Sequence, residues 1–235
     1  MISLDKENLN KEQFEAFYEK PNPWSFDGTL NDLARQRILK NIFSKTKFTS
    51  GIDIACGEGF LTARMDFIDS KVGVDVSNTA IARASCAYPN INFVCGDAFK
   101  DRVIDGTFDF VSCFEALYYP SSLTDRKKAL ENLRNYGSEN ATFAFSVVTI
   151  GENQYRKYFT KNEFIQLLTE MRFLIEGVYG FVLGGEKGSS FINRVFRKFF
   201  RHVFSSVAVK KLANQTMNAS DDNVYQHLFI CRKKN

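Results

Sequence analysis

The sequence predicts a doubly wound α/β domain built on a seven-stranded, mostly parallel sheet. From residue 51 onward, short apolar runs alternate with helical segments, which is the pattern of repeated strand–helix–strand units. The first run leads into a tight turn that contains Gly57 and Gly59. Asp53, Asp75 and Asp97 lie near the ends of the first three runs, 22 residues apart. This regularity indicates parallel strands that end at one edge of a sheet.

Composition limits the class of protein. A chain of 235 residues suits one domain with an elaboration, and 44% hydrophobic with 25% charged residues is typical of a folded protein. The net charge of +4 is too small to indicate a nucleic-acid-binding protein, but it is compatible with an anionic acceptor. Five scattered cysteines and two histidines predict neither a disulfide framework nor a metal site. We expect a cytoplasmic protein that is not an integral membrane protein, because no apolar run approaches ~18 residues.

Two helices are expected before the first strand. Asn10 and Gln13 stand in capping-box register for a short helix, which Pro21 ends. Apolar residues recur at helical spacing over 30–43, which predicts a second helix. We expect residues 1–48 to form an N-terminal helical arm that acts as a lid.

The remaining elements follow in alternation. We expect strands near 51–55, 71–75, 91–94, 108–113, 141–149, 173–181 and 224–232. Helices are expected near 58–68, 78–88, 122–136 and 161–171. Thr160 and Glu163 form a capping-box pattern at the start of the last of these helices. The cofactor-binding domain would therefore take residues 49–183 and 221–235.

Residues 184–220 interrupt the alternation. This segment begins with a glycine-rich stretch, continues through a basic stretch rich in phenylalanine, and ends in polar residues. We interpret its middle as an inserted helix. Its phenylalanine face would pack on the sheet domain, or the helix would act as a lid over the acceptor or as a surface for anionic partners or lipid.

The glycine turn predicts a cofactor site. Gly57 and Gly59 let the backbone approach a ligand, and a carboxylate at the position of Asp75 can accept hydrogen bonds from ribose hydroxyls. A nicotinamide cofactor is the rival, because Gly57-x-Gly59-x-x-Thr62 approximates the dinucleotide fingerprint. Asp53 favours S-adenosylmethionine, because a carboxylate repels a pyrophosphate and attracts an amino group and a sulfonium.

The segments DIACGEG, VGVDVS, GDAF and FDFVSCFEALYY resemble, in order and spacing, the successive motifs of class I methyltransferases. The resemblance covers about residues 50–150 and implies a Rossmann-like fold that binds S-adenosylmethionine. It implies that Asp53, Ala55, Gly57 and Gly59 surround the methionine moiety and that Asp75 holds the ribose. It also implies that Asp97, Ala98 and Phe99 contact adenine. Val76 and Phe114 would belong to the cofactor site as well. Ala55 stands where the family usually has its first glycine, and this small substitution should be tolerated. Any one acid could be a plain strand-end or helix-cap carboxylate.

Two further segments resemble the nodulation-factor N-methyltransferase group. They are Asn22-Pro23-Trp24-Ser25-Phe26, which precedes an arginine-bearing helix, and Phe114-Glu115-Ala116-Leu117-Tyr118-Tyr119. Members of that group methylate an amino-sugar nitrogen on a chitooligosaccharide. The resemblance implies that Trp24 and Arg37 close over the cofactor, with Arg37 paired to its methionine carboxylate. The alternatives are a core tryptophan and a solvated helix arginine.

The candidate catalytic residues follow the fourth strand. Glu115, Tyr118 and Tyr119 would lie at the carboxyl end of the sheet, where open α/β sheets place their ligand crevice. Glu115 could shield an ammonium or accept its proton. The tyrosines could hydrogen-bond sugar hydroxyls or simply form the wall of the pocket. His202 and His227 are alternative bases, although both are expected to be structural.

We therefore expect a methyltransferase for a small polar acceptor, an amine of an amino sugar or sugar derivative. O-methylation of a sugar or another small molecule is an alternative, and so is a cofactor-binding module without catalysis. A nucleic-acid acceptor is disfavoured because the chain lacks an Asn-Pro-Pro-Tyr-like element. We expect the acceptor pocket between the tip of the fourth strand and residues 184–220, and we expect a folded core to survive deletion of residues 1–43.

Overall fold

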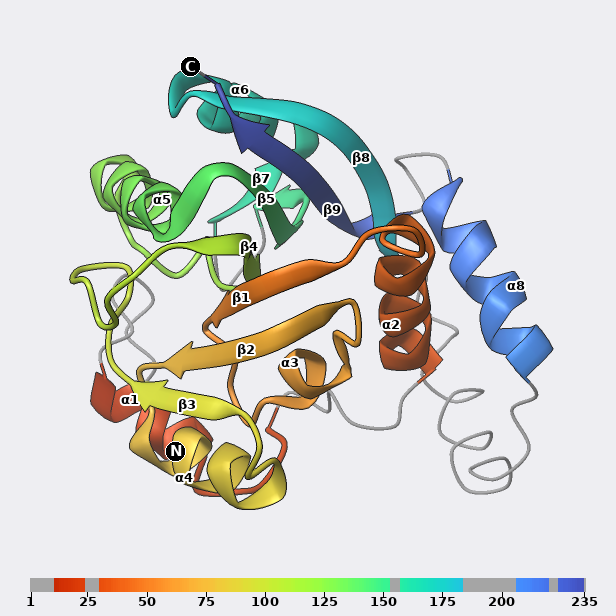
Figure 1. Ribbon diagram of the computed structural model, residues 1–235. Coiled ribbons are helices and arrows are strands. Elements are labelled where there is room, and N and C mark those ends of the chain that lie inside the picture. Colours follow the sequence, from red (N-terminus) through yellow and green to blue (C-terminus); the bar gives the residue numbers. More distant parts are fainter. Residues whose placement is uncertain (1–10, 24–29, 153–156, 184–205, 220–223, 235) are drawn as a thin grey trace.

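The computed structural model describes residues 11–23, 30–152, 157–183, 206–219 and 224–234 (Figure 1). Two helices come first, α1 (Lys11–Phe17) and α2 (Leu30–Ile42). The proposed capping residue Asn10 lies outside the described residues, as does Trp24.

A seven-stranded sheet forms the centre of the molecule, in the order β3-β2-β1-β4-β5-β9-β8. Its strands are β1 (Phe48–Ile54), β2 (Ile68–Asp75), β3 (Asn92–Cys95), β4 (Phe108–Phe114), β5 (Gly137–Val148), β8 (Phe173–Leu183) and β9 (Val224–Lys233). The first five strands are parallel, whereas β9 is antiparallel to both β5 and β8. The predicted doubly wound, mostly parallel sheet is confirmed.

The helices that connect the strands are α3 (Phe60–Arg64), α4 (Asn78–Ala87), α5 (Leu123–Tyr136) and α6 (Lys161–Glu170). The side chain of Thr160 accepts from the backbone N–H of Glu163, and the Glu163 carboxylate accepts from the N–H of Thr160, so the predicted capping box is confirmed. A two-stranded hairpin, β6 (Ile150–Glu152) with β7 (Lys157–Thr160), was not predicted.

Helix α3 is much shorter than the predicted 58–68. The chain leaves the helical conformation at Met65, which is buried, and Phe48 of β1 already pairs with Ile68 of β2. The second strand therefore begins three residues before the predicted residue 71. Burial of apolar side chains between helix and strand ends α3 earlier than the helical pattern indicated.

One of two hydrophobic clusters joins α2 to the sheet. Ile38 and Leu39 of α2 are 0% and 2% exposed, respectively. Four phenylalanine rings meet beside them at centroid distances between 4.9 and 6.2 Å, contributed by Phe43, Phe48, Phe67 and Phe110. Helix α2 is thus part of the core. We therefore expect deletion of residues 1–43 to remove part of the core, contrary to the prediction from the sequence that a folded core would survive it.

Within the insertion the structure describes one helix, α8 (Ser206–Met217), which packs against α2 and β8. Ala213 and Thr216 of this helix are buried, and the backbone of Gly180 in β8 passes so close to Thr216 that no side chain fits at Gly180. The basic, phenylalanine-rich stretch before α8 lies outside the described residues. None of the described helices combines the length and apolar character that crossing a membrane requires.

Candidate active site

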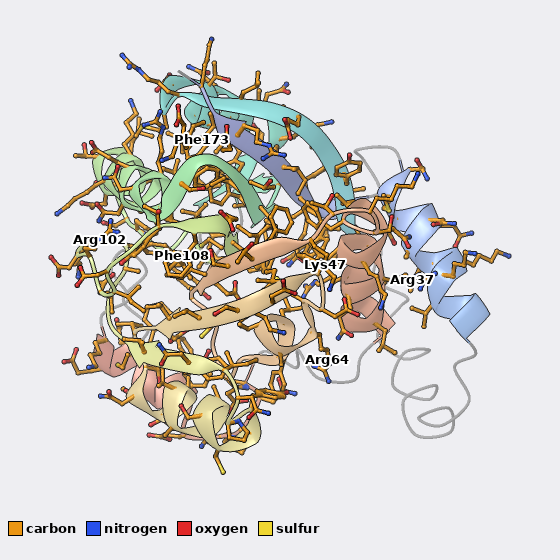
Figure 2. All side chains as sticks on the ribbon, in the orientation of Figure 1. Arg37, Lys47, Arg64, Arg102, Phe108 and Phe173 are labelled. Atoms are coloured by element: carbon orange, nitrogen blue, oxygen red, sulfur yellow. The ribbon has the colours of Figure 1, made fainter. Side chains whose placement is uncertain are left out.

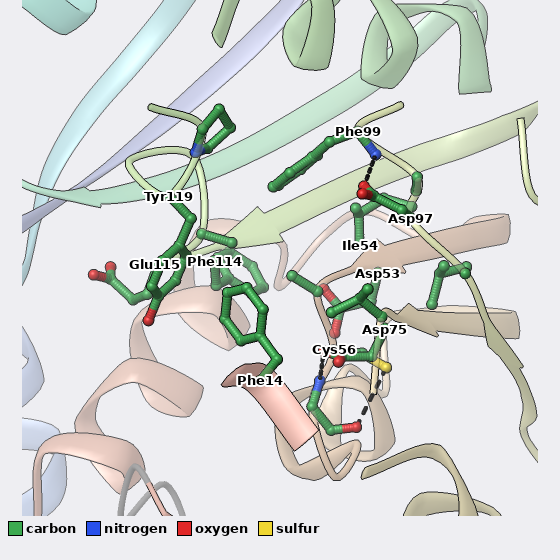
Figure 3. Close-up of a pocket in the computed structure, with 18 of the residues that line it drawn as sticks. Phe14, Asp53, Ile54, Cys56, Asp75, Asp97, Phe99, Phe114, Glu115 and Tyr119 are labelled. Carbon is green, nitrogen blue, oxygen red and sulfur yellow. Dashed lines mark hydrogen bonds between the residues drawn. The ribbon is translucent and has the colours of Figure 1, made fainter. Parts of the chain in front are cut away.

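A cavity of about 690 Å³ lies at the carboxyl ends of β1 to β4 (Figure 3). The tips of these strands form its floor, with Asp53, Asp75 and Glu115 in the lining. Phe14 and Tyr18, from α1 and the turn that follows it, cover it. A volume of this size falls within the range of small-molecule sites.

The glycine turn after β1 is fixed by its backbone conformation. Gly57 and Gly59 have φ values of +55° and +76°, in the left-handed region that disfavours side chains. A Cβ on Gly57 would lie 2.7 Å from the Tyr18 hydroxyl, whereas one on Gly59 would lie 2.7 Å from the ring of Phe93. Gly57 lines the cavity, but Gly59 does not, because it faces the packing between α3 and β3. Gly59 therefore contributes to the site indirectly, by letting the turn pack closely against β3.

Ala55, also in the cavity wall, has a φ of +59°. The backbone there has the conformation that a glycine adopts without strain, which gives a physical reason for the usual glycine at this position. The substitution is tolerated structurally, as expected, but at a cost in backbone strain.

Asp53, at the end of β1, is 3% exposed and held by two hydroxyl groups. Thr62 of α3 donates to one carboxylate oxygen at 2.5 Å, and Ser112 of β4 donates to the other at 2.7 Å. Burial raises the pKa of Asp53 to about 6, although both hydroxyl groups oppose the shift. Thr62, which the sequence presented only as a misfit to the dinucleotide fingerprint, thus orients the acid at the centre of the cavity.

Asp75, at the end of β2, accepts hydrogen bonds from the backbone N–H groups of Gly57 at 2.8 Å and Ser77 at 3.0 Å. Burial raises its pKa to about 6 as well. Each carboxylate oxygen has two lone pairs, so both oxygens keep acceptor capacity after these bonds. The arrangement fits a pair of ribose hydroxyls.

The end of the cavity beyond β3 contains Asp97, Ala98 and Phe99, with Val76 from the tip of β2. One Asp97 oxygen accepts from the backbone N–H of Phe99 at 3.2 Å, and the other lies 3.1 Å from the ammonium of Lys100. The carboxylate of Asp97 can accept a hydrogen bond from an exocyclic amino group, and the ring of Phe99 can stack on a base. This end of the cavity fits adenine.

Glu115 follows β4 at the opposite side of the cavity, as Figure 3 shows, with a φ of +57° and 7% exposure. The Ser146 hydroxyl donates to its Oε1 at 2.7 Å, whereas its buried Oε2 has no hydrogen-bond partner in the described part of the chain. Burial raises the pKa of Glu115 to about 7, against the opposing effects of Arg35 and Ser146. A carboxyl group with this pKa can hold or release a proton near neutrality.

Aromatic side chains narrow the cavity beside Glu115. Phe114, Tyr118 and Tyr119 all line it, and the two tyrosine rings lie 4.9 Å apart. Phe14 of α1 meets the ring of Tyr119 edge to face at 5.0 Å. Phe14 was not predicted to belong to the site. The available signal was an aromatic residue on an isolated helix that precedes the sheet domain.

Glu15 holds α1 in place over the cavity. Its carboxylate accepts from the Ser77 hydroxyl at 3.0 Å and from the backbone N–H groups of Asn78 and Thr79, at the start of α4. Carboxylates are favourable at helix N-termini because free N–H groups point outward there. The arm thus reaches the cofactor side of the cavity, although Trp24 itself lies outside the described residues.

The arginine of α2 that lines the cavity is Arg35, not Arg37. Two residues along a helix correspond to a rotation of about 200°, so the two side chains leave α2 in different directions. Arg37, labelled in Figure 2, lies outside the cavity lining. The Nη2 group of Arg35 donates to Oε1 of Gln226 at 2.7 Å, and its guanidinium lies 5.8 Å from the ring centroid of Phe181.

The insertion does not close the cavity through α8, which contributes none of the lining residues. Phe181 of β8 and the arm occupy that side instead. His227 is 3% exposed, and its Nδ1 lies 2.6 Å from the Thr149 hydroxyl, outside the cavity lining. Its contacts are those of a structural histidine. His202 lies outside the described residues.

Residues 52–138 match the family described as "Methyltransferase domain". No curated protein matches the sequence. Among solved structures, N-methyltransferase NodS from Bradyrhizobium japonicum WM9, in complex with S-adenosyl-L-homocysteine, has a TM-score of 0.67 at 17% identity and covers 96% of this chain and 98% of its own. The [4+2]-cyclase SpnF has a TM-score of 0.64 at 15% identity, covering 97% and 98%. An S-adenosylmethionine-dependent methyltransferase from Clostridium acetobutylicum ATCC 824 has a TM-score of 0.60 at 14% identity, covering 95% and 99%.

At these identities the structural matches show a shared fold, while the domain match concerns the sequence from β1 to the start of β5. Asp53, Asp75, Asp97 and Glu115, which the match includes, lie together in one cavity. The sequence match identifies residues 52–138 as a methyltransferase domain, and the fold and the acid-lined cavity agree with an S-adenosylmethionine-dependent methyltransferase of class I.

Proposed function

We propose that this enzyme methylates the amine nitrogen of a small polar acceptor, an amino sugar or sugar derivative. The observation that carries the proposal is Glu115, a buried carboxyl group in the cavity wall with one oxygen available for a ligand. Such a group suits an amine, because an ammonium must lose a proton before its nitrogen lone pair can attack the methyl carbon. NodS, named an N-methyltransferase, has the same fold over nearly the whole chain and adds support.

The cofactor supplies a methyl group activated by a sulfonium. In this proposal the residues that bind it are Asp53, Ala55, Gly57, Asp75, Val76, Asp97, Ala98, Phe99 and Phe114, all of which line the cavity. Asp53 would provide negative charge near the methionine amino group, Asp75 would hold the ribose, and Asp97 with Phe99 would receive adenine. Gly59 would act indirectly, by keeping the turn in shape.

Glu115 would act on the acceptor. The amine nitrogen forms a bond to the methyl carbon while the carbon–sulfur bond breaks and its electron pair stays on sulfur. The Glu115 carboxylate accepts the proton that the nitrogen loses, and Ser146 keeps the carboxyl group oriented through its hydrogen bond. Tyr118 and Tyr119 would position the acceptor, and α1 with Phe14 would exclude water, since alignment and desolvation carry much of this catalysis.

Substitution of Glu115 by Gln tests the proposal. It preserves shape and removes the charge, so single-turnover methyl transfer to an amino sugar should fall at least about tenfold, while affinity for S-adenosylhomocysteine changes little. The wild-type rate should rise with pH through an apparent pKa near 7, and this dependence should disappear in the variant. Glu131→Gln, on the exposed surface of α5, is the matched control.

Measurements of methyl transfer and of cofactor affinity together distinguish the alternative roles of Glu115. Equal loss of cofactor affinity in Glu115→Gln would place Glu115 in the cofactor site, and an unchanged rate would make it a purely structural acid. SpnF shows that this fold also occurs in a protein named a cyclase. Tight cofactor binding without methyl transfer to any amine or hydroxyl acceptor would therefore contradict the proposed reaction while leaving the binding site in place.

A further inference from the structure

Two oppositely charged side chains lie beyond the residues assigned to the cofactor. Arg35 is 6% exposed and Glu115 is 7% exposed, and both line the same cavity. Burial raises the pKa of Glu115, and the positive charge of Arg35 opposes that shift. Yet Oε2 of Glu115 has no hydrogen-bond partner in the part of the chain that the structure describes.

The guanidinium of Arg35 is held from the side of the antiparallel strands. Gln226, which accepts from its Nη2, belongs to β9, and Phe181, whose ring lies under it, belongs to β8. In the sheet, β9 and β8 follow β5, whereas the cofactor residues stand at the tips of β1, β2 and β3. Adjacent strands are about 4.8 Å apart, so this end of the cavity is separated from the adenine end by several strand widths. Figure 3 shows Glu115 on the other side of the cavity from Asp97 and Phe99.

A fixed guanidinium limits which amines this end of the cavity accepts. Arginine stays charged in proteins, so a simple monocationic amine beside Arg35 would be repelled by it. An amine that also carries an anion would place opposite charge against both groups. Arg35 suits carboxylate or phosphate because its planar fork can form two parallel hydrogen bonds to either group.

We infer that Arg35 and Glu115 form a two-charge acceptor subsite, which takes a small amine bearing a carboxylate or phosphate near the nucleophilic nitrogen. Arg35 binds the anion and thereby determines specificity, while Glu115 faces the amine. The inference rests on the proposed amine methylation and narrows its acceptors to zwitterions, such as amino-sugar phosphates or amino-sugar acids.

The test compares methyl transfer from labelled S-adenosylmethionine to matched amines with and without an anion. Suitable pairs are glucosamine with glucosamine 6-phosphate, and serinol with serine. In the wild type, kcat/KM should be at least about tenfold higher for an anionic member, Arg35→Gln should bring the ratio close to one, and Arg35→Lys should restore part of it. Lys40→Gln, an exposed charge on the same helix, should keep the wild-type ratio.

A second measurement separates the acceptor from the methionine carboxylate of the cofactor, the other anion that Arg35 could bind. Arg35→Gln should bind S-adenosylhomocysteine and 5′-methylthioadenosine, which lacks the amino-acid moiety, as the wild type does. Selective loss of S-adenosylhomocysteine affinity would overturn the inference, and so would equal transfer to neutral and anionic amines or transfer to none of these amines. Arg35-dependent transfer to anionic hydroxyl compounds alone would instead refute amine methylation and retain the anion subsite.

Discussion

Backbone strain at single residues is concentrated in the lining of the cavity. Among the described residues, Ala55, Glu115, Asn22 and Arg172 have positive φ without being glycine. Ala55 and Glu115 directly follow β1 and β4, and both line the cavity. A left-handed non-glycine residue costs about 1–2 kcal/mol. At Glu115 this conformation brings the carboxyl group into the pocket wall, so the strained backbone positions a residue of the site.

Replacing Ala55 by Gly should stabilise the protein by about 0.5–1 kcal/mol, because relief of the left-handed strain exceeds the added chain entropy of the unfolded state. Urea unfolding of the two proteins measures this difference. Arg172→Gly, after α6 and with a φ of +59°, is the matched control outside the cavity. An unchanged or lower midpoint for both variants would contradict the strain argument.

Asp75→Asn should weaken S-adenosylhomocysteine binding by about 1–3 kcal/mol, because a carboxylate that receives ribose hydroxyls is replaced by a weaker acceptor. Calorimetry measures the affinity directly. Asp69→Asn, at an exposed position of the same strand, should leave it unchanged. If the folded Asp75 variant kept the wild-type affinity, the ribose assignment would have to be abandoned.

The two helices of the arm differ in what they do. Helix α1 has no buried residue of its own, and Glu15 attaches it to the start of α4. Helix α2, in contrast, buries Ala34, Ile38 and Leu39 in the core. Only α1 is therefore a separable cover, and the arm predicted as one unit consists of a cover and a core helix.

Deleting residues 1–20 should leave a cooperatively unfolding protein whose S-adenosylhomocysteine dissociates about tenfold faster or more, because the cover over the cavity is lost. Deleting residues 1–43 should abolish cooperative unfolding, because the buried side of α2 leaves with it. Thermal unfolding and stopped-flow dissociation measure the two effects. A stable protein without α2 would refute the assignment of that helix to the core.

Elements with a strong local pattern could be predicted from the sequence. The alternation of strands and helices, the strand-end acids and the capping box at Thr160 all depend on neighbours in the chain. Boundaries set by distant contacts could not be predicted. Helix α3 ends early because β2 starts early against β1, and the β6–β7 hairpin has no hydrophobic alternation of its own.

The same distinction applies to the site. Asp53, Asp75 and Asp97 reach the cavity because each follows a parallel strand. Which arginine of α2 reaches it depends on how that helix is rotated against the sheet, and the helical pattern alone did not fix that rotation. Phe14 enters the site only through docking of α1, a contact made between segments far apart in the chain.

The molecule as a whole should lose stability as the pH rises from about 4 to about 7 without cofactor. Asp53 and Asp75 have their pKa raised to about 6, and Glu115 to about 7, so the folded state keeps protons that the unfolded state has already released. The lowered pKa values of Glu15 and Asp66 act in the opposite direction, but only below about pH 4.5.

Urea unfolding at pH 5 and pH 7.5 measures this dependence. The free energy of unfolding should be lower at pH 7.5, by up to a few kcal/mol. Glu115→Gln removes one of the three groups and should reduce the difference. Greater stability at pH 7.5 would show that these carboxyl groups are not buried as described.

The position of β9 bears on how the protein emerges from the ribosome. This strand lies between β5 and β8, although it follows both in the chain. During synthesis β5 and β8 have no partner on their facing edges until residues 224–233 have left the exit tunnel. The nascent chain therefore exposes two open edges until β9 has been synthesised, and we expect it to depend on chaperones before that point.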